Sequence, residues 1–143
     1  MKIIILPLVA GIVIAQGIKF LIKSNQLKFN IKNMTAYSGM PSGHSAIVVS
    51  LATITGLELG WRDPVFFIAI ILALIVIRDA IGIRQYLGQH GKILNILVKD
   101  LKEDKMLDEE YPHLLERIGH TPLQVLVGSL IGFFTSLIGY YYF

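Results

Sequence analysis

SGMPSGHSA, residues 38–46, combines a turn, a helix start and a histidine. Pro41, Ser42 and Gly43 form a turn that opens into an apolar run, so we expect Ser42 to cap the helix that follows. The free N–H groups of a first helical turn attract anions, phosphate above all. His44, with an ordinary pKa near ~6.5, can carry a proton there. The stretch indicates either a phosphate site or a capped helix with an incidental histidine.

The composition indicates an integral membrane protein. Of 143 residues, 54% are hydrophobic and 16% charged, which lies outside the range of soluble globular proteins. This length suits one domain, residues 1–143, built as an all-α bundle of four or five transmembrane helices with amphipathic interfacial helices. There are no cysteines, which excludes disulfides and thiolate metal sites. The net charge of +3 fits loops that contact anionic lipid, and we expect no nucleic-acid partner.

Four apolar runs are candidate spans. Residues 3–22 are long enough to cross a bilayer, and since no A-x-A cleavage pattern follows, we interpret them as a retained helix rather than a signal peptide. The other runs cover residues 46–59, 65–83 and 123–143. Residues 24–37 alternate apolar and polar side chains, which predicts an extended loop at the interface.

Several charged side chains lie at the ends of these spans. Lys19, beside Gln16, is a candidate phosphate ligand that faces inward. Arg78 and Asp79 can neutralise each other. Arg84 has no near carboxylate in sequence apart from Asp79, so we expect its guanidinium to be free to bind an anion.

Residues 91–119 hold most of the charge. Their apolar side chains are spaced as on amphipathic helices, including Leu114, Leu115 and Ile118 near the end. The mixed charges of residues 99–110 predict a solvated face, with a lid over the site as the alternative. His113 is interpreted as an ordinary surface residue.

Counting the crossings places one group of polar side chains together. The first helix ends, the second begins, the third ends and the fourth begins on one side, which brings Lys19, His44, Arg84 and His120 to the same membrane face. Most Lys and Arg residues also lie towards this face. The positive-inside rule then makes it the cytoplasmic face of a bacterial-type cytoplasmic membrane, with both termini outside.

Two histidines, a lysine, an arginine and a helix start together suit phosphoryl transfer without a metal or cofactor. One histidine would attack phosphorus and form a phosphohistidine, and the other would protonate the leaving alkoxide. Lys, Arg and N–H groups would hold the remaining phosphate oxygens.

PSGHSA resembles the signature of the phosphatidic acid phosphatase type 2 and vanadium haloperoxidase superfamily, in its short divergent branch. HTPLQVLVG, residues 120–128, is similar to the block that carries the family's nucleophilic histidine. The resemblance implies a helical bundle, attack by His120 and leaving-group protonation by His44. It also implies phosphate contacts from Ser42 and Gly43.

The chain departs from the family pattern at three places. Of the first signature only Lys19 carries over, since Gln26 stands where the arginine belongs. The carboxylate expected to orient the nucleophile is Gln124, which can accept a hydrogen bond but cannot balance an imidazolium charge. Glu116 or Asp79 could supply that charge instead. Leu114 occupies the position of the third-signature arginine.

RQYLGQH, residues 84–90, has the family's six-residue spacing between arginine and histidine. We interpret Arg84 as the displaced phosphate ligand and His120 as the nucleophile. His90 is the alternative nucleophile.

Two functions remain open at this point. The first is a membrane phosphatase that hydrolyses a lipid phosphate, either phosphatidate-like or a polyprenyl phosphate or diphosphate. The second is a protein that binds or translocates phospholipid without catalysis, for which Gln124 and the incomplete first signature argue. Gly128 and Gly132 form a G-x-x-x-G spacing that could also support a homo-oligomer.

Overall fold

The computed structural model describes residues 2–22, 39–103, 111–116 and 118–142, and within these ranges all regular structure is helical. The expected all-α bundle is therefore confirmed. The elements are α1 (Lys2–Leu8), η1 (Val9–Ala15, a π-helix), α2 (Gln16–Leu21), α4 (Gly43–Leu59), α5 (Pro64–Ile81), α6 (Ile83–Glu103) and α7 (Pro122–Tyr142). The predicted interfacial loop at residues 24–37 lies outside the described residues.

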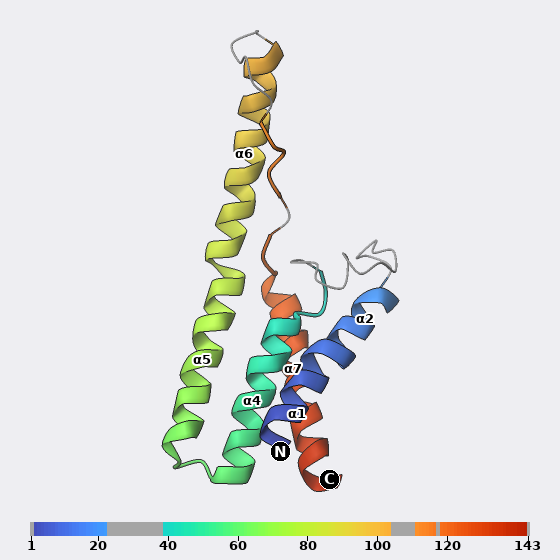
Figure 1. Ribbon diagram of the computed structural model, residues 1–143, viewed down its shortest axis with the longest axis vertical. Helices are drawn as coiled ribbons and strands as arrows, with labels where there is room; N and C mark the ends of the chain where they lie inside the picture. Colours follow the sequence, from blue (N-terminus) through green and yellow to red (C-terminus); the bar gives the residue numbers. More distant parts are fainter. Residues whose placement is uncertain (1, 23–38, 104–110, 117, 143) are drawn as a thin grey trace.

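Helix α4 is the centre of the bundle. It packs against α7, α5 and the N-terminal helix formed by α1 and η1 (Figure 1). The core where these helices meet is made of small side chains, Ala10, Ala15 and Ala46, with Ile131 packed against them. Small residues allow helix backbones to approach closely, which replaces a large hydrophobic core in a membrane protein.

Gly128 and Gly132 of α7 pack against the start of α4 in the same chain. A Cβ on Gly128 would overlap the carbonyl oxygen of Ser42, and one on Gly132 would overlap that of Ala46. One turn further on, the hydroxyls of Ser50 and Ser136 lie 2.6 Å apart in a buried hydrogen bond. The G-x-x-x-G face that we considered for a homo-oligomer is thus occupied by α4 of the same chain.

The outer surface is suited to lipid. Two helices of the described chain, Pro64–Glu103 and Pro122–Tyr142, are long and apolar enough to span a membrane, and Ile5–Lys19 and Gly43–Leu59 are shorter apolar helices. Large apolar side chains of α5 are exposed, among them Phe67, Ile68, Ile71 and Ile75. The chain is an integral membrane helical bundle.

Helix α6 continues almost in line with α5 and extends beyond the bundle (Figure 1). The prediction that residues 91–119 are helical at both ends is wrong for the second half. Residues 111–116 and 118–119 are not helical and run back alongside α6 towards α7 (Figure 1). Pro112 and Gly119, whose φ is 94°, both disfavour a helix there.

Candidate active site

The turn at the start of α4 is capped as its sequence predicts. Ser42 has an extended backbone, and its Oγ accepts hydrogen bonds from the Ser45 N–H at 3.4 Å and the Ser45 hydroxyl at 2.9 Å. Ser42 and Gly43 are buried, whereas His44 is exposed in the first turn. The backbone of this turn is therefore fixed while the His44 imidazole can be reached from solvent.

His120 is held at the junction of α5 and α6. Its side chain is buried, with 3% of the residue exposed. Its N–H donates to the Ala80 carbonyl oxygen at 3.0 Å, and its own carbonyl oxygen accepts from Gln85 Nε2 at 2.7 Å. Gly119 lies so close to Gln85 that a Cβ there would meet the Gln85 nitrogen at 2.9 Å. Hydrogen bonds and close packing together fix the backbone that carries His120.

Thr121 and Gln124 form a capping box at the start of α7. The Gln124 N–H donates to Thr121 Oγ1 at 3.3 Å, and the Thr121 N–H donates to Gln124 Oε1 at 3.0 Å. Sequence reasoning missed this arrangement, although Thr-x-x-Gln with Pro122 at the first helical position carries its signature.

The capping box determines which ring nitrogen of His120 carries the proton. Because a backbone N–H can only donate, the Gln124 atom that faces Thr121 is the oxygen. His120 Nδ1 lies 3.2 Å from the same oxygen, so Nδ1 must carry the proton and donate it. Nε2 of a neutral His120 then keeps its lone pair, which is the electron pair that a nucleophile needs.

Gln124 also joins the two sequence motifs. Its main-chain carbonyl oxygen accepts a hydrogen bond from the Ser42 N–H at 3.0 Å. The same residue therefore orients His120 with its side chain and anchors the PSGHSA turn with its backbone. The starts of α4 and α7 are locked side by side.

The charges around His120 favour its neutral form. Burial is the main cause and lowers the pKa of His120 from its ordinary 6.5, while the hydrogen bond with Gln124 raises it. The positive charges of Lys19, His44 and Arg84 lower the pKa further. These three side chains, predicted to share one membrane face, thus lie within electrostatic reach of His120.

The chain matches the model of the divergent PAP2 family over residues 1–135. The chain belongs to this family. A relative in Bacillus subtilis (strain 168), described as an uncharacterized membrane protein, YuiD, is 32% identical over 151 residues, which cover 97% of this chain and 94% of the relative. No solved structure matches the chain significantly.

Lys19 and Gln16 belong to α2, which continues the N-terminal helix towards the site of this divergent PAP2 protein. Lys19 is buried, with 3% of the residue exposed. The Gln16 amide abuts Gly43, whose Cβ, if present, would lie 3.4 Å from Gln16 Nε2. Gln16 Oε1 is buried and has no hydrogen-bond partner among the described residues. A polar side chain in this position is available to a ligand at the α4 start.

Arg84 is not free, which corrects the prediction from sequence. Its Nε donates to Asp79 Oδ2 at 2.6 Å, and both side chains are about one-third exposed. In a continuous helix, residues five apart point about 140° away from each other. The break at Gly82, between α5 and α6, brings them together. The bond uses Nε, so the outer guanidinium nitrogens are the part of Arg84 left to bind an anion. Arg84 and Asp79 line a cavity of about 570 Å³ together with Leu87, Leu115 and Ile118.

The structure does not bring His90 or Glu116 to His120. His90 is exposed on α6, about 120° around the helix from Arg84, so the two cannot face one ligand. The Glu116 carboxylate instead accepts from Asn95 Nδ2 at 2.9 Å and lies 3.8 Å from His113 Nε2. Asp79 is engaged by Arg84, so neither carboxylate takes the role that Gln124 leaves open.

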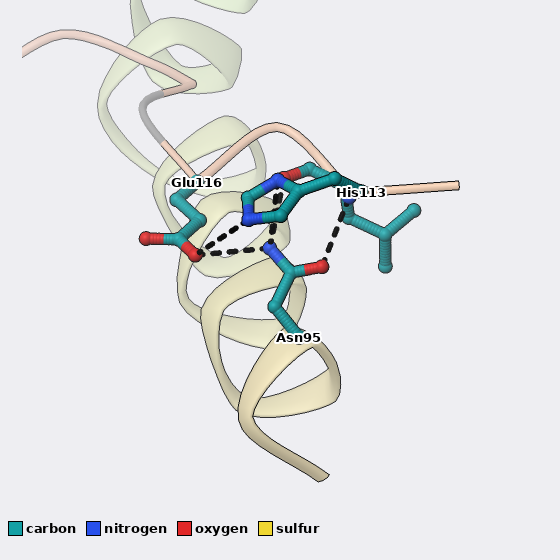
Figure 2. Close-up of polar contacts among 4 residues, drawn as sticks. Asn95, His113 and Glu116 are labelled. Atoms are coloured by element: carbon teal, nitrogen blue, oxygen red, sulfur yellow. Dashed lines mark hydrogen bonds and ion pairs between the residues drawn. The ribbon is translucent and has the colours of Figure 1, made fainter. Parts of the chain in front are cut away.

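Asn95 is a residue that sequence reasoning missed. Its side chain accepts from the Leu114 N–H and donates to the Leu114 carbonyl oxygen, both at 2.9 Å. Figure 2 shows Asn95 together with His113 and Glu116. Gly88 and Gly91 leave room for the same segment, since a Cβ at either would crowd the backbone of Glu116 or Leu115. We call residues 111–116 and 118–120 the strap, because α6 lies alongside them and His120 is at their end.

Among the described residues, no three His, Asp or Glu side chains come together as metal ligands would.

Proposed function

We propose that the protein hydrolyses a lipid phosphate through a phosphohistidine intermediate on His120. The observation that carries this proposal is Gln124, which fixes the His120 tautomer with its side chain and holds the Ser42 turn with its backbone. A nucleophilic nitrogen and an anion-binding helix start thereby meet at one point of a membrane bundle.

The reaction begins with attack of the His120 Nε2 lone pair on phosphorus. The ester P–O bond breaks, and the leaving oxygen takes a proton from the His44 imidazolium. A water molecule then attacks phosphorus, the P–N bond breaks, and His44 takes the proton from that water. The N–H groups at the α4 start, with Lys19 and the outer nitrogens of Arg84, stabilise the negative phosphate oxygens.

The alternative is a protein that binds or moves a lipid phosphate without hydrolysing it. The neutral Gln124 favours this reading, since it cannot balance the charge that develops on His120 during attack. Both functions share the anion site at Ser42, Gly43 and His44 and differ only in the reactivity of His120.

The test is phosphate release by purified protein from a panel of diacylglycerol phosphates and polyprenyl phosphates, with EDTA present. We expect vanadate-sensitive release that His44→Ala and His120→Ala both abolish. His90→Ala is the matched control and retains activity. Release that survives His120→Ala contradicts the mechanism. Lipid phosphate binding with no turnover supports the non-catalytic alternative.

We also propose that the site faces the cytoplasm, with both termini outside. The support is the excess of Lys and Arg in the segments at the site end of the helices, which is the pattern of cytoplasmic loops.

A further inference from the structure

An apolar groove runs down the side of the bundle between the N-terminal helix and α7. It has a volume of about 480 Å³, within the range of pockets that hold small molecules (~300–1,000 Å³). Its lining is apolar and comes from the two helices: Leu6, Val9, Ile14, Val127, Leu130, Ile131, Phe134, Thr135, Ile138 and Gly139.

The one hydroxyl in this lining is already satisfied. Thr135 Oγ1 donates to the Ile131 carbonyl oxygen of its own helix at 2.7 Å. The groove therefore offers no polar side chain that needs a ligand partner, and its occupant must be hydrocarbon.

One wall of the groove is an unusual helix. Val9 and Ile14 belong to η1, a π-helix of seven residues. Such segments are rare in proteins, and those that occur are often found at functional sites. On its other side η1 is pressed onto α4 at Gly11, where a Cβ would overlap the Ile47 side chain. The packing of η1 against α4 therefore fixes the position of this wall.

The groove begins at the proposed phosphate site. Val127 is next to Gly128, which touches the backbone of Ser42, and Ile14 lies half a turn from Gln16, whose amide abuts Gly43. At the other end, Gly139 packs against the Leu6 side chain, since a Cβ on Gly139 would overlap Leu6 Cδ2, and both residues line the groove. From Val127 to Gly139 the helix rises about 18 Å, close to one leaflet, or half of the ~30 Å hydrocarbon core.

We infer that this groove holds a single hydrocarbon chain of the lipid whose phosphate binds at the Ser42–His44 turn. The inference rests on the proposed phosphate site but not on hydrolysis. It names the ligand class as a lipid phosphate in which one chain lies against α7, with any second chain left in the bilayer.

The test is photo-crosslinking with hexadecyl phosphate that carries a diazirine at the chain end, in phosphatidylcholine vesicles containing the full-length protein. We expect labelling of the α7 peptide near Ile138, competed by unlabelled hexadecyl phosphate but not by hexadecanol. Equal labelling by a hexadecanol probe, or equal labelling of the outer face of α5, overturns the inference.

Ile138→Trp fills the end of the groove away from the phosphate site, and we expect labelling near that end to be lost. Ile75→Trp is the matched control, since both isoleucines are exposed to lipid, at 56% and 62%, and Ile75 is on α5 outside the groove. Leu130→Trp, at the outer edge, serves as a second variant if Ile138→Trp does not give folded protein. Crosslinking retained in folded Ile138→Trp, or in Leu130→Trp where that variant replaces it, contradicts the inference. Phosphate-dependent crosslinking without turnover contradicts only hydrolysis.

Discussion

Gln124 is the residue whose chemistry decides between the two proposed functions. It accepts hydrogen bonds from Thr121 and His120 through one oxygen, so a carboxylate in its place would keep both contacts. It differs from a carboxylate in charge and in its second terminal atom, which is an NH2 group instead of an oxygen. Gln124→Glu, which has nearly the same shape, therefore tests the effect of charge while both hydrogen bonds are kept.

We predict that Gln124→Glu raises the rate of hydrolysis. The added negative charge stabilises the imidazolium that develops on His120, and an opposite charge at this distance raises a histidine pKa by about 1 unit or more. The acid limb of the pH–rate profile should then move to higher pH by that amount. Measured profiles of wild type and Gln124→Glu check this, and an unshifted limb would mean that His120 is not the titrating group.

Gln124→Leu should have the opposite effect. It removes the acceptor that keeps the proton on Nδ1, so the lone pair is no longer held at Nε2, and we expect at least a tenfold loss of activity, equivalent to about 1.4 kcal/mol. The start of α7 also loses one hydrogen bond of its capping box, from the Thr121 N–H to the Gln124 side chain, at a cost of about 1 kcal/mol. A rate equal to that of wild type in folded Gln124→Leu would contradict the tautomer argument.

The pH dependence of the wild-type protein follows from His120. Burial lowers its pKa from the ordinary 6.5, so the neutral, nucleophilic form persists below pH 6.5 and is lost only as the pH falls through the lower folded value. We expect the acid limb of kcat/KM to lie below pH 6.5. An acid limb above that value would contradict the burial of this imidazole.

The contact between α4 and α7 is the element-scale feature that holds the site together. Gly128→Ala places a Cβ against the Ser42 backbone, and overpacking of this kind typically costs about 1–3 kcal/mol. We expect a lower midpoint of thermal unfolding in detergent. We also expect activity to fall by more than the amount of folded protein falls. Gly17→Ala is the control, because no atom lies within 4 Å of its added Cβ and the helix gains about 1 kcal/mol. Equal midpoints for the two variants would contradict the packing.

The strap gives a second prediction at this scale. Asn95→Ala removes both hydrogen bonds to Leu114, each worth about 1 kcal/mol net, and frees the segment that ends at His120. Activity should fall severalfold while the bundle stays folded. Lys99→Ala is the control on the same helix, since it breaks only an exposed ion pair with Glu103 worth about 0.3–0.5 kcal/mol. Comparable activities in the two variants would show that the strap does not position His120.

The sequence predicted elements whose signals are local. Ser42 caps α4 through a contact three residues away, and α4 begins where expected. Helix α5 begins at Pro64, one residue before the apolar run at 65–83, and Asp63 caps it through a contact two residues away. The strap could not be predicted in this way, because its path depends on Asn95, which bonds residues 19 to 21 positions further along the chain. The pairing of Arg84 with Asp79 was missed for a related reason, since it requires the helix break at Gly82.

At the scale of the whole molecule, the bundle has two distinct ends. The starts of α4 and α7 and the end of α2 lie at the same end of the bundle as the candidate site, while the α4–α5 turn lies at the other end (Figure 1). Because the chain has no cysteines, single cysteines can report the orientation. In intact cells, we expect an impermeant maleimide to label Arg62→Cys at the α4–α5 turn and not Lys102→Cys on α6. The reverse pattern would overturn the proposed cytoplasmic site.

The way α6 holds the strap also bears on how the family can change over evolution. Asn95, Gly88 and Gly91 contact the strap mainly through its main chain, so the identity of its side chains matters little to its path. Family members can therefore vary at positions 111–115 without moving the histidine that follows. Substitutions at the three α6 positions should be rare, and so should insertions within residues 111–116, because extra length there would disturb the alignment with α6.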